Sequence, residues 1–378
     1  MVSSDSEGRG PGPDPRRGGG EITADELVGR LGTDRAPMVV DVREPAEFVE
    51  WSIAGARNIP MSELGERIAE LDHDREVVVV CAKGARSRAV VDALGAAGVA
   101  ASGLLGGMEA WASVYDTALV DLELAEIVQV RRRGKGCLSY VVGAGEEAFV
   151  VDPSLDTGRY LDVAARRGWH VTRVFDTHLH ADHVSGARAL AAEAGASLHL
   201  NPADSFEFPF EPMVDGQWFE LGPNVHFGVT IFGTPGHTKG STVLEVGGRA
   251  ILTGDTLFVD GVGRPDLAER VEEFAHDLYR SLHAKLLALP EDVLVLPAHY
   301  GDKVDVPPGA PVAASLATLR RSLEQLDWDE PTFVAWAASR ATPRPPNYAE
   351  IISVNMGRHS LSAEESLRLE LGPNRCAA

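Results

Sequence analysis

The stretch Thr177-His178-Leu179-His180-Ala181-Asp182-His183 directly follows residues 171–176, Val-Thr-Arg-Val-Phe-Asp, which we expect to form a β-strand. Further along the chain, other polar residues also come just after strand-like segments. Loops that follow strands can meet at one rim of a layered fold, so we expect these side chains to come together. Imidazole and carboxylate groups in this number suit Zn(II), Fe(II) or Mn(II). The predicted cluster comprises His178, His180, Asp182, His183, His237, Asp255 and His299.

The pattern around this cluster predicts two sheets flanked by helices. Strand-like segments follow one another closely at first, and then alternate with helical ones. We expect strands at 127–130, 138–142, 148–151, 171–176, 226–232, 241–246, 250–252 and 293–296, and helices at 160–167, 184–194 and 267–289. Beyond residue 311 the pattern is mostly helical, with a proline-rich break at 342–346.

Residues 122–305, with their histidines and aspartates, resemble the metallo-β-lactamase fold, an αβ/βα sandwich. The fold alone does not decide the chemistry, because hydrolases, nucleases and oxygenases share it. In two-zinc hydrolases, the resemblance implies one ion on His178, His180 and His237 and a second on Asp182, His183 and His299, with Asp255 bridging. In persulfide dioxygenases it implies one Fe(II) on His178, His237 and Asp255 only. The other four, His180, Asp182, His183 and His299, would then orient ligands and water.

The segment after Asp255 favours the dioxygenase. Residues 257–267, Leu-Phe-Val-Asp-Gly-Val-Gly-Arg-Pro-Asp-Leu, resemble a segment of bacterial persulfide dioxygenases, although Val262 stands where single-domain enzymes usually carry cysteine. Residues 344–355 also resemble the tail of that group. We expect Arg264 to bind a carboxylate of the thiol carrier, such as glutathione, or alternatively to pair with Asp266. The alternative activity is a two-zinc thioesterase similar to glyoxalase II.

A second set of candidate functional residues lies nearer the N-terminus, around Cys81. The run Cys81-Ala82-Lys83-Gly84-Ala85-Arg86-Ser87 sits between a predicted strand, residues 77–80, and a predicted helix, residues 87–97. A helix N-terminus and the two cations favour a thiolate over a thiol, and Gly84 lets the loop bend sharply. A buried structural cysteine is the alternative interpretation.

This loop resembles the active loop of single-domain rhodaneses, which are α/β sulfurtransferases. The resemblance extends over about 95 residues, although Trp51-Ser52 stands where the family usually shows Gly-His. It implies that Cys81 carries sulfane sulfur as a persulfide. We assign Cys81 and Arg86 to catalysis, and Lys83 and Gly84 to substrate binding. The matching segments are residues 41–44, 47–48, 53–60, 81–87 and 106–111.

Together these resemblances predict a fusion of a rhodanese with a persulfide dioxygenase. Thiol persulfide and O₂ would give sulfite and thiol at the iron, and sulfite and thiosulfate would exchange sulfur with Cys81. The direction of the rhodanese step stays open. Tethering two such activities raises the effective concentration of one domain's product near the other. A non-catalytic sulfur carrier or sensor is the third possibility.

Composition sets outer limits on function. The 35 Lys and Arg residues against 56 Asp and Glu residues give a net charge of −21, which argues against a nucleic acid or an anionic membrane as partner. Three cysteines are too few for a disulfide framework, and no secretory signal or membrane span is evident, so we expect a cytoplasmic protein. A homo-oligomer stays open. The predicted segments are a disordered tail at 1–20, an α/β domain at 21–115, the sandwich at 122–305 and a mainly helical extension at 306–378.

Overall fold

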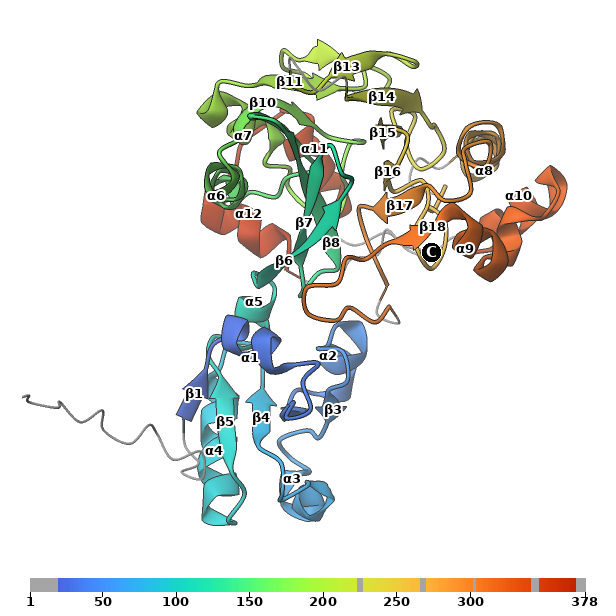
Figure 1. Cartoon of the computed structure of the whole chain (residues 1–378). Coiled ribbons are helices and arrows are strands. Elements are labelled where there is room, and N and C mark those ends of the chain that lie inside the picture. Colours follow the sequence, from blue (N-terminus) through green and yellow to red (C-terminus); the bar gives the residue numbers. More distant parts are fainter. Residues whose placement is uncertain (1–19, 223–226, 266–269, 302–303, 341–346, 372–378) are drawn as a thin grey trace, which may run out of the picture. The chain divides into compact units, whose positions relative to one another are not determined.

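The computed structural model describes residues 20–222, 227–265, 270–301, 304–340 and 347–371. The chain divides into two compact units, Met1–Val114 and Tyr115–Ala378 (Figure 1). Apart from Gly20, where the first strand begins, the predicted disordered tail lies outside the described residues. The whole of the predicted proline-rich break, 342–346, also lies outside them.

The first unit is built on a parallel sheet whose strands run in the order β1-β5-β4-β2-β3. The central strand β4 consists of four valines with 0% exposure, as expected for a parallel strand covered on both faces. Val77 and Val79 pack on one face, and Val78 and Val80 pack on the other. This confirms the predicted α/β architecture. The strands are β1 (Gly20–Ile22), β2 (Met38–Asp41), β3 (Arg57–Asn58), β4 (Val77–Val80) and β5 (Ala101–Leu104); the helices are α1 (Ala24–Arg30), α2 (Pro45–Glu50), α3 (Leu64–Arg67), the 3₁₀ helix η1 (Ile68–Glu70), α4 (Ala85–Ala96) and α5 (Gly107–Trp111).

The second unit contains two sheets. One has seven strands in the order β12-β11-β10-β9-β8-β7-β6, and the other has six in the order β13-β14-β15-β16-β17-β18. The first sheet comprises β6 (Tyr115–Asp121), β7 (Glu126–Arg132), β8 (Cys137–Ala144), β9 (Glu147–Val151), β10 (His170–Phe175), β11 (Ser197–Leu200) and β12 (Glu211–Pro212). The second comprises β13 (Trp218–Glu220), β14 (Gly228–Gly233), β15 (Thr242–Val246), β16 (Ala250–Gly254), β17 (Leu294–Pro297) and β18 (Ala314–Ser315).

Helices cover the outer face of each sheet (Figure 1). Side chains alternate along the strands: Tyr140 and Val142 enter the core between the sheets, whereas Val141 packs outward against α6 and α7. On the second sheet, Ile251 and Val295 pack outward against α8, α9 and α10. This confirms the predicted αβ/βα sandwich. The helices are α6 (Thr157–Arg167), α7 (Ala187–Ala194), α8 (Val271–Ser281), the π-helix η2 (Leu282–Leu286), α9 (Leu316–Ser322), the 3₁₀ helix η3 (Glu324–Leu326), α10 (Glu330–Ser339), α11 (Tyr348–Asn355) and α12 (Ala363–Leu369).

The chain beyond residue 305 belongs partly to this sandwich. Strand β18 pairs with β17 at the edge of the second sheet, and α9 and α10 complete its outer layer. Helices α11 and α12 follow at the C-terminal end. Across the described ranges, none of the helices combines the length and hydropathy that crossing a membrane requires.

Candidate metal centre and cysteine loop

Three side chains that follow strands of both sheets meet at one rim of the sandwich. His178 comes after β10, His237 after β14 and Asp255 directly after β16. Asp255 Oδ2 lies 3.3 Å from His237 Nε2 and 3.7 Å from His178 Nε2. All three atoms are buried and have no hydrogen-bond partner among the described residues, although buried polar atoms normally have one. The set therefore fits a divalent metal, with one ligand atom from each residue.

Neighbouring groups fix the two imidazole rings in the form that binds a metal. The Thr177 hydroxyl donates to Asp152 at 2.9 Å, so it accepts a hydrogen bond from His178 Nδ1, also at 2.9 Å. His237 Nδ1 donates to the Arg264 carbonyl at 3.0 Å. With the proton on Nδ1, each Nε2 presents a bare lone pair to the centre. Burial also lowers the pKa of both histidines, which favours the neutral rings that metals require.

The carboxylate of Asp255 is held by His299. His299 Nδ1 lies 2.6 Å from Asp255 Oδ1, and His299 Nε2 lies 2.9 Å from Asp182 Oδ2. Burial alone would lower the pKa of His299, but the two carboxylates outweigh it and raise the pKa well above its usual value. His299 therefore lies between Asp255 and Asp182 with one ring nitrogen close to each carboxylate, and Oδ2 of Asp255 is left turned towards the two unpaired histidine nitrogens.

A second group of possible ligands lies beside this bridge. Asp182, His183, His299 and Cys137 each offer one atom, and these atoms lie within 4.8 Å of one another. His183 Nδ1 is 3.2 Å from Asp182, and the Cys137 thiol donates to Asp182 at 3.6 Å. This group already satisfies much of its own hydrogen bonding.

His180 belongs to a third buried group. Its Nε2 lies 3.0 Å from Asp152 and 3.8 Å from Asp176. Burial acts to lower the pKa of His180, but Asp152 outweighs it and raises that pKa to about 9. The ligand atoms of this group are distinct from those of His178 and His237.

The buried carboxylate of Asp204 joins two of the ligand loops. It accepts hydrogen bonds from the Leu179 N–H at 2.9 Å, from the Thr238 hydroxyl at 2.9 Å and from the Gly240 N–H at 2.8 Å. Leu179 belongs to the loop of the first histidine ligand, and the other two belong to the loop of the second. Asp204 thus sets the distance between the two loops.

Arg264 contributes to the centre through its backbone. Its carbonyl orients His237, and the residue as a whole is only 4% exposed. The preceding Gly263 lets its backbone pass close to that of Asp255, because a Cβ at position 263 would lie 1.8 Å from the Asp255 carbonyl oxygen. The alternative ion pair with Asp266 involves a residue outside the described ranges, and the contact of Arg264 with substrate stays a prediction.

In the first unit, Cys81 lies where β4 ends and the loop before α4 begins. Its Sγ accepts hydrogen bonds from the Gly84 N–H at 3.2 Å and the Ser87 N–H at 3.4 Å. Burial would raise the pKa of the thiol, but hydrogen bonds from Ser87 and other loop amides outweigh it and lower that pKa below its usual value. The loop therefore favours the nucleophilic thiolate.

The two cations of this loop are paired with carboxylates. Lys83 Nζ lies 2.8 Å from Glu109, and Arg86 lies 3.2 Å from Glu47. These partners offset much of the positive potential that the sequence suggested for Cys81. Backbone N–H groups therefore contribute most to stabilising the thiolate.

Comparison with known families agrees with both constellations. A family model described as the metallo-beta-lactamase superfamily matches residues 132–299, and one described as the rhodanese-like domain matches residues 23–114. A hydroxyacylglutathione hydrolase from Acidiphilium cryptum is 30% identical over 247 residues, which cover 63% of this chain and 91% of that protein. The chain belongs to the metallo-beta-lactamase superfamily and carries an N-terminal rhodanese-like domain. The predicted fusion of these two folds is confirmed.

Other relatives within the superfamily are dioxygenases. Human persulfide dioxygenase ETHE1 is 30% identical over 178 residues, which cover 43% of this chain and 63% of that protein. The crystal structure of ETHE1 from Myxococcus xanthus matches with a TM-score of 0.52 and 25% identity, over 65% of this chain and 100% of that one. The match to a Rhizobium johnstonii hydroxyacylglutathione hydrolase spans 52% of that enzyme at 37% identity. The chain thus spans about half to two thirds of several curated relatives, and identity does not separate the two activities.

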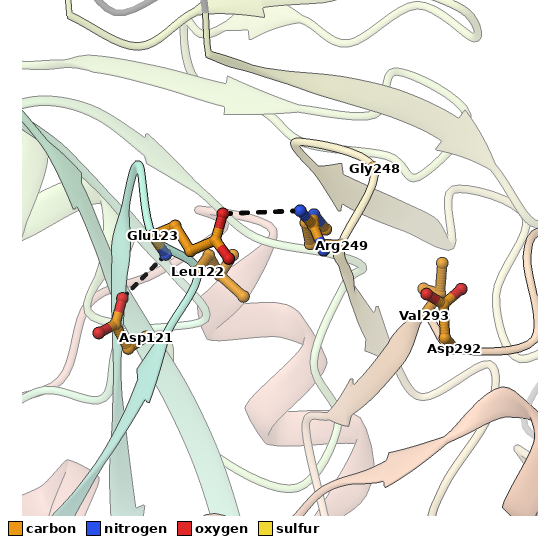
Figure 2. A pocket seen from close by; sticks show the side chains of 7 residues that line it. All are labelled: Asp121, Leu122, Glu123, Gly248, Arg249, Asp292 and Val293. Atoms are coloured by element: carbon orange, nitrogen blue, oxygen red, sulfur yellow. Dashed lines mark hydrogen bonds and ion pairs between the residues drawn. The ribbon is translucent and has the colours of Figure 1, made fainter.

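A surface pocket at the other end of the sandwich is separate from the metal centre (Figure 2). It lies where β16 and β17 begin, whereas Asp255 and His299 follow the ends of these strands. Arg249 faces Glu123 across it at 3.7 Å, and both side chains are mostly exposed. Its lining residues are Asp121, Leu122, Glu123, Gly248, Arg249, Asp292 and Val293.

Sequence reasoning missed four side chains at the centre: Cys137, Asp152, Asp176 and Asp204. Asp152 and Asp176 directly follow the buried strands β9 and β10. The rule that identified Asp255, a polar residue just after a strand, would have found both. Cys137 begins β8 beside the backbone of His299, and Asp204 lies in a loop with no comparable signal.

Proposed function

We propose that the second domain is a persulfide dioxygenase that holds one Fe(II) on His178, His237 and Asp255. The overall reaction would be R–S–SH + O₂ + H₂O → R–SH + SO₃²⁻ + 2H⁺, in which the outer sulfur is oxidised and O₂ is reduced. Iron on two histidines and a carboxylate supplies the redox chemistry and open positions that this needs, whereas zinc has no redox chemistry.

The observation that carries this proposal is a compact set of three buried ligand atoms that all lack a hydrogen-bond partner among the described residues. His178 Nε2, His237 Nε2 and Asp255 Oδ2 face one another without partners, whereas both nitrogens of His299 lie close to carboxylates. His180 likewise directs Nε2 to Asp152. The side chains outside the triad thus serve to hold it, which favours one metal over two.

The surrounding residues would perform distinct tasks in this reaction. Thr177 and the Arg264 carbonyl keep the two histidine rings oriented, and His299 holds the ligating carboxylate. The Arg264 guanidinium would bind a carboxylate of the thiol carrier, such as glutathione, with its planar fork. An Arg264→Lys variant would then raise KM for glutathione persulfide more than it lowers kcat.

We further propose that the rhodanese-like domain exchanges sulfane sulfur at Cys81. Sulfite would attack the outer sulfur of a Cys81 persulfide, so that Cys–S–S⁻ + SO₃²⁻ → Cys–S⁻ + S₂O₃²⁻. The cradle of N–H groups stabilises the leaving thiolate. Arg86 would act in this step, and Lys83 and Gly84 would bind the anionic substrate. Run in reverse, the same step would load Cys81 from thiosulfate.

A two-zinc thioesterase is the second candidate. It is favoured by the second ligand group, in which Asp182, His183 and His299 lie close to Cys137, and by the similarity to hydroxyacylglutathione hydrolases. In this scheme an ion would replace the close contact between His299 and Asp182.

Metal reconstitution separates the candidates. The full chain is stripped of metal and loaded anaerobically with Fe(II) or Zn(II), and then metal per chain, O₂ uptake on glutathione persulfide and S-lactoylglutathione cleavage are measured. We expect one ion per chain and O₂ uptake with iron only. Two zinc ions with efficient thioester cleavage, and no O₂ uptake with iron, would contradict the dioxygenase. Cys81→Ser is the matched control: it should keep O₂ uptake on added persulfide but lose thiosulfate formation.

A further inference from the structure

Several backbone N–H and C=O groups of the loop that contains His180 and His183 are hydrogen-bonded to side chains at the ends of the C-terminal helices. Residues 180–185 form neither helix nor strand. The side-chain amide of Asn355 donates to the carbonyls of His180 at 2.9 Å and His183 at 2.8 Å. Its oxygen accepts from the Ser185 N–H at 2.9 Å. One buried side chain at the end of α11 therefore satisfies three backbone groups of the loop.

Glu370, which follows α12, makes a second set of buried contacts. Its carboxylate accepts from the Val184 N–H at 2.6 Å and from Arg132 at 2.6 Å. Its backbone carbonyl accepts from Lys135 Nζ at 2.6 Å, and Lys135 also donates to the Asp182 carbonyl at 3.1 Å. Glu370 and Arg132 are 3% and 4% exposed at their side chains, so water cannot replace these contacts without local opening.

These contacts lead to the metal ligands. The loop that Asn355 and Glu370 hold, residues 180–185, includes Asp182. The Asp182 carboxylate lies 2.9 Å from His299, and His299 in turn holds Asp255. A shift of the loop would thus alter the bridge that orients Asp255. Partners beyond the ligands typically change metal affinity about 10–100-fold when they are removed.

We propose that Asn355 and Glu370 are positioning residues of the metal centre, and that docking of α11 and α12 is thermodynamically coupled to metal binding. The inference rests on the metal site of the proposed function but not on the reaction performed there. Coupling between two equilibria is reciprocal. If docking of α11 and α12 onto the loop of residues 180–185 strengthens metal binding by a given factor, bound metal must favour that docking by the same factor.

The test compares two variants and a control. Asn355→Asp keeps the shape but turns a carboxylate towards two carbonyls, and Glu370→Gln keeps an acceptor for Val184 but removes the charge opposite Arg132. Glu364→Gln is the control, because Glu364 is 75% exposed and makes an i,i+4 ion pair with Arg368.

Two readouts are independent of turnover. Co(II) affinity is measured by competition with a coloured chelator, together with the absorption bands of bound Co(II), and amide hydrogen exchange is followed over 180–185 and 348–369. We expect Co(II) to bind about 10–100-fold more weakly to both variants, with altered bands and faster exchange over 180–185. In the wild type, Co(II) should slow exchange in α11 and α12.

The outcomes distinguish this inference from the proposed function. A wild type that binds no metal would overturn both the proposed function and the positioning role of Asn355 and Glu370. If the wild type binds Co(II), and folded Glu370→Gln matches the control in Co(II) affinity, absorption bands and amide hydrogen exchange, the positioning role alone would be overturned. Exchange in α11 and α12 that does not respond to Co(II) would overturn the coupling.

Discussion

Replacing Asp204 with asparagine should loosen two metal-ligand loops at once. Asp204 is 8% exposed, and its carboxylate accepts hydrogen bonds from the Leu179 N–H, the Thr238 hydroxyl and the Gly240 N–H. Leu179 and Thr238 share Oδ2, and Gly240 bonds Oδ1. Asparagine has the same shape but only one acceptor oxygen. In either orientation, a buried N–H must therefore face the new NH₂ group.

The expected magnitude follows from these contacts. A hydrogen bond to a charged group contributes about 1.5–3 kcal/mol, and an orphaned buried donor costs about 1–3 kcal/mol. We expect the free energy of unfolding of the second domain to fall by about 2–4 kcal/mol. If about 2 kcal/mol of this acted on metal binding, the dissociation constant would rise about 30-fold, since 1.4 kcal/mol is a factor of ten.

The assay is chelator competition with Co(II) on the full chain, alongside thermal unfolding. Asp215→Asn is the matched control: Asp215 also accepts a backbone N–H, from Gly233 at 2.8 Å, and an amine, from Lys285 at 2.8 Å, but its side chain is 58% exposed and it joins no ligand loops. We expect the control to stay within about 1 kcal/mol of wild type. An Asp204→Asn dissociation constant within twofold of both proteins would show that Asp204 does not hold the loops.

Three further changes test other parts of the two sites. The pKa of Cys81 lies below its usual value of 9.0, so its thiolate should persist at pH values below the pKa of a free cysteine. Thiolate absorption in the ultraviolet, taken as the difference between wild type and Cys81→Ser, measures this. A titration midpoint equal to that of free cysteine would contradict stabilisation of the thiolate by the loop N–H groups. Gly107→Ala should destabilise the first domain by about 3 kcal/mol and abolish sulfur transfer, because its Cβ would lie 2.1 Å from the Cys81 carbonyl oxygen at a φ of +59°. Gly55→Ala shares the positive φ without the clash and should keep sulfur transfer, so equal losses would assign the effect to strain alone. His299→Gln should retain one metal per chain with about 10–100-fold weaker affinity, whereas a fall from two ions to one would favour the two-metal scheme.

Strong local signals made much of the fold predictable. The four valines of β4 are apolar on both faces, and the structure places the strand at the predicted residues, 77–80. The strands that precede the ligands are less uniformly apolar but contain β-branched and aromatic residues, so the positions of His178, His237 and Asp255 just after strands could be anticipated. Parallel strand ends then bring such residues to one rim.

Edge strands were harder to predict. Strand β6, Tyr115–Asp121, alternates buried and exposed positions, includes the half-exposed Leu119, and falls mostly between the two predicted domains, 21–115 and 122–305. Strands β12 and β13 have two and three residues, most of them exposed. These segments are strands because a neighbouring strand supplies hydrogen-bond partners, and a local apolar pattern cannot show that.

The side-chain partners of the metal centre could not be predicted for a related reason. Asp204, Asn355 and Glu370 lie far from the ligands in sequence, and each acts by satisfying backbone N–H or C=O groups. Any loop has such groups, so residue type and spacing carry no information about which side chain will reach them.

The number of metals depends on ring orientation rather than on which residues are present. The same seven histidines and aspartates fit one ion or two. In this structure Asp255 directs one oxygen to the two unpaired histidine nitrogens and the other to His299, which reaches Asp182 on its far side. A second ion must displace the His299–Asp182 contact, and Asp182 lies in the loop that Asn355 and Glu370 hold in place. In our proposal, the C-terminal helices would stabilise the arrangement in which His178, His237 and Asp255 present their unpaired ligand atoms to one ion.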